Sequence, residues 1–190
     1  MIALILAAVV ASDDPIATPK GGGDEAAKEE AFVDDSAAPP EQKMAFKMFT
    51  GTWRCSGKAN TELAPDVPTT VTIAFKSDLG RFLSVRIDEQ KSKQNPHASS
   101  SQEIWGYSSA LGGFVMNGAD SQGGFYAGSS TGWIGDRFWW TTDSARSGKR
   151  VKVKNTFTKK SDKEMVFERA VDATNSGDAM RVTFEGTCKR

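Results

Sequence analysis

Few side chains in this sequence have the types and spacing that catalysis requires. The chain of 190 residues has a single histidine, His97, and two cysteines, Cys55 and Cys188. One histidine and two cysteines that can pair with each other exclude most metal sites with nitrogen or sulfur ligands. A Ser-His-Asp triad would have to use His97, and no nucleophile-elbow pattern accompanies it. The sequence therefore predicts no catalytic residue, no metal and no cofactor. It leaves enzymatic activity open but favours a binding or structural role.

Two polar residues stand out because they interrupt apolar faces of predicted strands. Arg169 alternates with apolar residues from position 165 to 171, and Asn155 does so from 151 to 157. Side chains of one strand face recur at every second position. A buried arginine needs a protein partner or an anionic ligand. The alternative is that Arg169 lies at the mouth of the structure and extends its charged end into water.

Aromatic side chains recur with the same period of two along several predicted strands. Core filling accounts for most of them, but aromatic side chains also line small-molecule sites. Together with the two polar positions they form the predicted ligand-binding set, which is Trp53, Trp105, Tyr107, Trp140, Asn155 and Arg169.

These side chains must be positioned by β-structure, because strand signals repeat about every ten residues from Thr50 onward. Short loops marked by Gly, Asp and Asn indicate antiparallel hairpins. Closing such a sheet on itself removes its exposed edges. We therefore predict an all-β fold, an antiparallel up-and-down closed barrel of about ten strands. The predicted strands are 50–57, 70–75, 82–87, 103–108, 113–118, 124–129, 132–142, 151–158, 164–173 and 180–188.

A short helix is predicted over residues 41–49, just before the first strand. Pro40 is well placed near its start. Met44, Met48 and Phe49 fall on one helical face. We expect this face to cover an open end of the barrel.

Closure of the barrel pairs the first strand, which contains Cys55, with the last strand, which contains Cys188. In an oxidising compartment a disulfide between them is expected, and it would close a loop of 133 residues. The chain-entropy estimate gives at most about 5 kcal/mol for such a loop. The alternative is two unpaired buried cysteines.

The N-terminal part of the sequence differs in composition from the rest. Residues 1–11 are uncharged and apolar, too short to span a bilayer, and end with the small-residue spacing of a signal-peptidase site before Ser12. They are predicted to be a signal peptide, although no basic residue precedes the apolar run and a frayed hydrophobic N-terminus is the alternative. Residues 12–40 carry a net charge of −6 and are predicted to be a disordered acidic linker.

Residues 41–190 then form the barrel domain, with a net charge of +6 and no basic cluster with interleaved aromatics. No nucleic-acid partner is expected. No integral membrane segment is expected after signal cleavage. An exported protein, periplasmic or extracellular, is predicted.

The segment Gly51-Thr52-Trp53 on the first strand resembles the lipocalin G-x-W motif, so the chain resembles a lipocalin-type (calycin) barrel. It is more similar to a bacterial family known only as a domain of unknown function, through Gly106-Tyr107 and the run 132–136, Gly-Trp-Ile-Gly-Asp. This resemblance covers about residues 45–190 and implies the fold and a small-molecule cavity, without chemistry. Nitrobindin-like haem barrels share the architecture, but His97 falls in a polar loop and is expected to be solvated.

Two hypotheses from different classes follow. In the first, the protein is an exported carrier or sensor of an amphipathic or fatty-acid-like molecule whose carboxylate meets Arg169. In the second, the barrel is filled and acts as a protein-interaction or structural module without a ligand. A lipase-like or isomerase enzyme is a third and more distant alternative. Ligand identity and oligomeric state are left open. A continuous interior void of roughly 300 Å³ or more would favour the first hypothesis.

Overall fold

The computed structural model describes residues 39–61, 64–146 and 148–190. The predicted signal peptide and nearly all of the predicted acidic linker lie outside the described residues. The elements are α1 (Pro40–Lys47), β1 (Gly51–Ala59), β2 (Val67–Asp78), β3 (Phe82–Glu89), β4 (Ser100–Ser108), β5 (Gly113–Asp120), β6 (Phe125–Ser130), β7 (Trp133–Ile134), β8 (Arg137–Arg146), β9 (Lys149–Ser161), β10 (Glu164–Asp172) and β11 (Arg181–Lys189).

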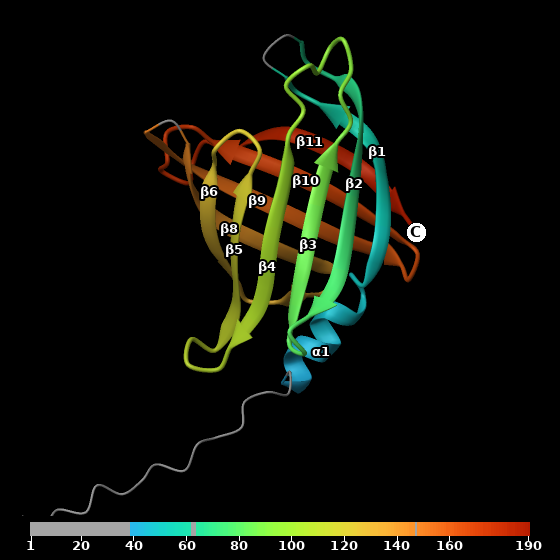
Figure 1. The fold of residues 1–190 in the computed structure, drawn as a ribbon, viewed down its shortest axis with the longest axis vertical. Helices are drawn as coiled ribbons and strands as arrows, with labels where there is room; N and C mark the ends of the chain where they lie inside the picture. The colour runs from blue at the N-terminus through green and yellow to red at the C-terminus, as the bar shows by residue number, and fades with distance from the viewer. Residues whose placement is uncertain (1–38, 62–63, 147) are drawn as a thin grey trace, which may run out of the picture. The chain divides into compact units, whose positions relative to one another are not determined.

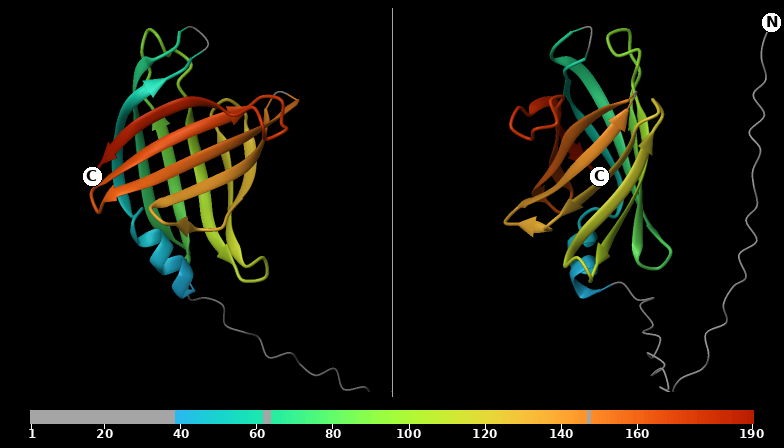
Figure 2. Two further views of the ribbon diagram at one scale, coloured as in Figure 1. Left: turned by 180° about the vertical axis from the view of Figure 1, so that it is seen from behind. Right: turned by 90° about the vertical axis from the view of Figure 1, so that its left-hand side faces the viewer.

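Ten antiparallel strands form a closed barrel, as predicted. Hydrogen-bonded neighbours run in the order β6-β5-β4-β3-β2-β1-β11-β10-β9-β8, and pairing of β6 with β8 closes the ring. The two-residue β7 pairs only with β8 among the described strands. Strands β8 to β11 slant across β1 to β5 (Figure 1; Figure 2, left), as closure of a twisted sheet requires.

The predicted disulfide is confirmed. In the pairing of β1 with β11, Cys55 lies directly opposite Cys188, and both side chains are fully buried. Two residues further along β1, Gly57 faces Gly186, where a Cβ on Gly57 would lie 2.0 Å from the Glu185 carbonyl oxygen. The seam between the first and last strands is therefore fixed by a covalent bond and by close backbone approach.

Helix α1 covers one end of the barrel, at the bottom of Figure 1, which we call the closed end. The helix begins with Pro40 at its first turn as predicted. The predicted buried face is partly wrong, because Met44 is 72% exposed and Phe46 is buried instead. The helix ends at Lys47, so Phe49 enters the barrel from the connection to β1 and not from the helical face.

Arg190, which follows β11, holds the connection between α1 and β1 in place. Its guanidinium donates hydrogen bonds to the carbonyl oxygens of Met48 and Thr50, and it lies over the Trp53 ring. Carbonyls at a helix C-terminus lack helical donors, so a basic side chain satisfies them.

Two strand predictions need correction. The predicted strand 132–142 is broken by a turn at Gly135-Asp136, where Gly135 has a φ of +61°, so that β7 and β8 form a hairpin. In the pairing of β10 with β11, the register shifts between Arg169 and Ala170, a β-bulge in which Thr183 of β11 is the extra residue. Beyond it Ala170 and Asp172 are the buried residues of β10, and Asp172 accepts hydrogen bonds from Thr174 and Gly177 of the loop that follows. Among the described residues, no helix is long and apolar enough to cross a membrane.

Candidate functional site

The barrel interior changes character along its length. Near the closed end, buried aromatic rings pack on one another, with Phe49 at the centre. Toward the opposite end, short side chains take the inward positions, including Thr69, Ser101, Thr142 and Ser144. We call these two regions the closed half and the polar half.

Glu103 of β4 is the most unusual side chain of the polar half. It is 1% exposed and lies between Val85 and Gly118 on the neighbouring strands. Its Oε2 accepts a hydrogen bond of 2.7 Å from Trp105 Nε1, and its Oε1 accepts one of 3.1 Å from the Tyr126 hydroxyl. A buried carboxyl is costly unless such donors compensate for the lost water.

Tyr126 reaches Glu103 across an intervening strand. Tyr126 is on β6 and Glu103 on β4, and Gly118 of β5 lies between them in register. A Cβ on Gly118 would approach the Tyr126 ring to 2.6 Å. The glycine therefore leaves the space in which the tyrosine ring lies, and this spacing makes the hydrogen bond possible.

The environment alters the protonation of both groups. Burial raises the pKa of the Glu103 carboxyl, while the hydrogen bond from Trp105 and the positive charge of Arg169 oppose this rise. Burial also raises the pKa of the Tyr126 phenol, and the charge of Glu103 adds to the effect. Desolvation disfavours the charged form of each acid, so Tyr126 stays protonated and serves as a hydrogen-bond donor.

Arg169 already has protein partners. Its Nε donates to Asn155 Oδ1 at 3.2 Å, and its Nη1 lies 3.4 Å from Glu89 Oε1. Glu89 Oε2 in turn accepts a hydrogen bond from the backbone of Ser99. The arginine side chain is 23% exposed, so it is neither sealed inside nor free in water. Its charge is balanced by Glu89, and an anionic ligand is not needed to stabilise it.

Trp140 of β8 has a polar atom without a partner. The side chain is fully buried, and its ring lies 5.0 Å from that of Trp105 and 5.4 Å from that of Phe138. Its Nε1 has no hydrogen-bond partner among the described residues. Trp140, Asn155 and Arg169 are lateral neighbours on β8, β9 and β10. The row therefore combines a buried indole N–H that no described residue accepts with two polar side chains on the neighbouring strands.

The predicted ligand-binding set divides between the two halves. Asn155 and Arg169 lie in the polar half, and Trp105 and Trp140 lie where the two halves meet, because the Trp105 ring packs on Phe49 while its Nε1 bonds to Glu103. Trp53 lies near the closed end, where its Nε1 donates to the Phe49 carbonyl oxygen at 2.8 Å. Tyr107 is also near that end, with its ring 5.2 Å from Phe114 and its backbone N–H bonded to Gln42 of α1. His97 is exposed in a turn, as predicted.

Sequence reasoning missed Glu103, Tyr126 and Glu89. A signal existed for Glu103, since it lies two positions before Trp105 and therefore on the same strand face. Tyr126 follows Phe125 and therefore lies on the opposite strand face, but the more apolar residue, Phe125, is the exposed one, at 63%. Glu89 could not be found in this way because it ends its strand.

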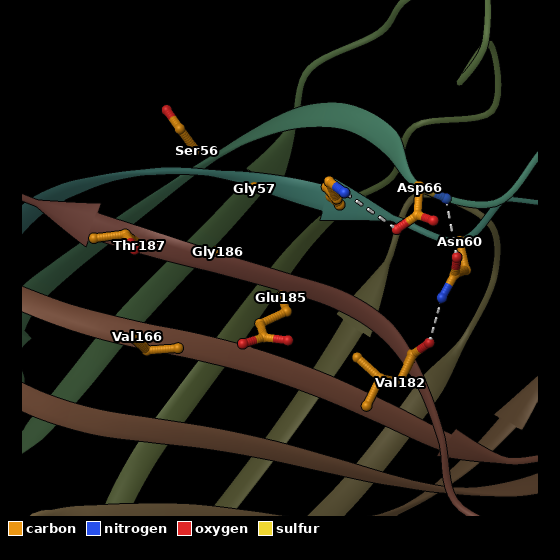
Figure 3. A pocket seen from close by; sticks show the side chains of 10 residues that line it. Ser56, Gly57, Asn60, Asp66, Val166, Val182, Glu185, Gly186 and Thr187 are labelled. Carbon is orange, nitrogen blue, oxygen red and sulfur yellow. Dashed lines mark hydrogen bonds and ion pairs between the residues drawn. The ribbon is translucent and has the colours of Figure 1, made fainter.

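Two surface hollows lie outside the barrel. One of about 480 Å³ runs over the outer face of β1 and β11, lined by the side chains of Ser56, Glu185 and Thr187 (Figure 3). The other, of about 670 Å³, lies beside it at the loop between β1 and β2. Neither is lined by a residue of the predicted set, so neither is a volume of the interior.

These features define the protein as a closed ten-stranded antiparallel β-barrel with a polar cluster inside. No protein-family model matches the sequence, and no curated protein sequence matches it. Among solved structures, Rv2717c from M. tuberculosis is similar with a TM-score of 0.61 and 13% identity, over 80% of this chain and 98% of that one. This likeness supports the fold alone.

Two other barrels resemble the chain less closely. A redesigned β-barrel has a TM-score of 0.42 and 15% identity, over 77% of this chain and 94% of that one. The barrel EF1p2_mFAP2b, bound to DFHBI, has a TM-score of 0.36 and 14% identity, over 78% of this chain and 98% of that one.

In the described part of the chain, no group of three or more His, Cys, Asp or Glu side chains is placed to hold a metal.

Proposed function

We propose that the protein is an exported barrel that binds a small amphipathic molecule, as a carrier or sensor. The supporting observation is the polar cluster inside an otherwise aromatic barrel, in which Glu103 is buried and the Trp140 donor is unused. Binding sites combine mostly apolar walls with a few polar groups that fix orientation. The polar head of the ligand would lie in this cluster beside Trp140, and its apolar body along the indole rings. The disulfide is consistent with export.

The same proposal includes membership of the bacterial barrel family of unknown function. Its support is the set of sequence motifs around Gly106-Tyr107 and Gly132-Trp133. In this chain Trp133 donates from Nε1 to the Ala45 carbonyl oxygen at 2.9 Å and so holds α1 against the barrel. That contact gives the second motif a structural role at the closed end.

Titration of tryptophan fluorescence with amphiphiles of eight to twelve carbons tests the proposed function. The series includes fatty acids and their uncharged derivatives, so that binding does not depend on one head group. We expect saturable binding at tens of micromolar ligand. Absence of binding by every member of the series would refute the carrier proposal. Native mass spectrometry of protein purified from its source provides an independent measurement of bound ligand.

The alternative is a filled barrel that acts as an interaction or structural module. It is favoured by large apolar side chains exposed around the closed end, which are Met44, Leu79, Leu111 and Ile134. Leu79 has a φ of 47°, a conformation that turn chemistry normally gives to Gly or Asn. Folding alone gives no reason for an exposed leucine at this position. If the titration is negative, this alternative replaces the carrier proposal.

A further inference from the structure

The group of side chains around Arg169 in the polar half contains two acids, Glu89 and Glu103, and one base. Arg169 pairs with Glu89, and Glu103 lies close enough for the charge of Arg169 to affect its protonation. A ligand carboxylate placed here would meet a guanidinium whose charge is already balanced, and it would lie near a second acid. Bringing another anion into a buried region of this kind is unfavourable.

The carboxyl of Glu103 is also occupied. Each of its oxygens accepts a hydrogen bond from a protein donor, Trp105 Nε1 or the Tyr126 hydroxyl. These donors hold the Glu103 carboxyl in place, so it does not need a cationic ligand. A positively charged head group would have to displace one of these donors.

The cluster lacks a hydrogen-bond acceptor for the indole N–H of Trp140. Trp140 Nε1 can only donate, and it has no partner among the described residues although the side chain is fully buried. Contacts with the rings of Trp105 and Phe138 limit how far the indole can turn. An oxygen of a bound molecule would satisfy this donor, and buried donors are rarely left unsatisfied.

We propose that the barrel binds an uncharged amphiphile through a carbonyl-type oxygen that accepts a hydrogen bond from Trp140 Nε1, and that it discriminates against the corresponding carboxylate. This inference rests on the proposed function. It replaces the fatty-acid anion expected from the sequence with a neutral ester, amide, ketone or aldehyde of similar length. Arg169 then serves to hold Asn155 and Glu89 in position and does not bind the ligand head group.

A matched pair of ligands tests this inference. Decanamide and decanoate have the same chain length, and at pH 8 only decanoate is charged. Both molecules have an oxygen that can accept from Trp140 Nε1, but only decanoate must bury a charge beside the balanced Arg169–Glu89 pair. Isothermal titration of the full chain should therefore give a dissociation constant at least about tenfold lower for the amide. If decanoate binds as tightly or more tightly, and Arg169→Met abolishes that binding, the inference is overturned while the proposed function stands. If neither molecule binds and the wider amphiphile series also fails, the proposed function itself fails.

The role of the indole donor needs its own variant and control. Trp140→Phe removes the donor and should weaken amide binding about five- to tenfold. Trp139→Phe is the matched control, because Trp139 precedes it on β8 with its side chain on the other strand face, beside Lys154. Equal effects of the two substitutions would contradict the inference.

A spectroscopic measurement on the unaltered protein covers the case in which Trp140→Phe fails to fold. With ¹⁵N-labelled tryptophan, the indole N–H resonance of Trp140 should move on addition of decanamide by more than that of Trp53. The Trp53 indole serves as an internal reference, because it already donates to the Phe49 carbonyl oxygen. An unchanged Trp140 resonance at saturating ligand would overturn the inference.

Discussion

The closed half and the polar half of the barrel use different interactions for the same geometric task of filling a closed sheet. In the closed half, the ring of Phe49 lies 5.1–5.5 Å from five other aromatic rings. The disulfide and the Arg190 contacts lie on the same side of the molecule. In the polar half, a carboxyl, a phenol and two indole N–H groups take corresponding inward positions.

The contrast between the two halves distinguishes side chains that stabilise the fold from side chains that cost stability. Burying aromatic rings and cross-linking the ends of the chain both stabilise the fold. Burying Glu103 and leaving Trp140 Nε1 unpaired both cost stability. A sequence selected only to fold would be expected to place apolar side chains in both halves, and local departures from folding rules are typical of functional sites. The comparison therefore assigns stability to the closed half and supports the proposal that a ligand binds in the polar half.

The largest expected effect comes from the centre of the closed half. Phe49→Ala removes a fully buried ring and should lower the free energy of unfolding by about 3–5 kcal/mol. Met44→Ala is the matched control from the same segment, because Met44 is exposed, and its effect should stay within about 0.5 kcal/mol. Urea unfolding followed by tryptophan fluorescence measures both. A small effect of Phe49→Ala would show that the closed half does not carry the stability assigned to it.

The disulfide should contribute a similar or slightly smaller amount. Replacing both Cys55 and Cys188 by alanine frees a loop of 133 residues and should reduce stability by about 2–5 kcal/mol. The measurement is the unfolding midpoint of this double variant beside that of the oxidised protein. Alkylation of the unreduced protein from its native compartment should label no cysteine. Labelling of two thiols there would contradict both the bond and the proposed export.

The barrel itself was predictable because its signals are local and repeated. Alternation along each strand predicts the faces on which Trp53, Trp105 and Trp140 lie. Closure predicts pairing of the first and last strands, and the two cysteines lie on those strands. The β-bulge at Thr183 of β11 was not predictable, since Thr183 and its two neighbours include no glycine or proline. The predicted burial of Met44 was wrong because the helical face that packs on the barrel is the one that carries Gln42, Ala45 and Phe46, and Met44 is not on it.

The site was less predictable than the fold because its contacts cross strands. Arg169 and Asn155 were found from alternation, but the pairing of Arg169 with Glu89 joins residues 80 positions apart. The contact between Tyr126 and Glu103 depends on Gly118, because any side chain at position 118 would occupy the space of the Tyr126 ring. A single sequence gives no register between strands, so such pairs appear only once the strands are aligned.

The smallest expected effect is the most specific to the polar half, and it concerns the charge of Glu103. Below the unfolded-state pKa of about 4.3, the carboxyl is protonated in both states and does not affect stability. As the pH rises above that value, the unfolded chain releases the proton, while the raised pKa of Glu103 retains it in the folded protein. Folding therefore becomes less favourable with rising pH until the pH passes the folded-state pKa.

Glu103→Gln removes this penalty and keeps the shape of the side chain. The amide oxygen can accept from Trp105 Nε1, and the amide nitrogen can donate to the Tyr126 hydroxyl. The variant should equal or fall slightly below the wild type in stability at pH 4 and exceed it at pH 8. The gain is about 1.4 kcal/mol for each pH unit that separates the folded and unfolded pKa values. Urea unfolding across this pH range measures it, with Glu185→Gln on the outer face of β11 as control. If the wild type and Glu103→Gln show the same pH dependence, Glu103 is ionised at little cost and the polar half is more hydrated than its burial indicates.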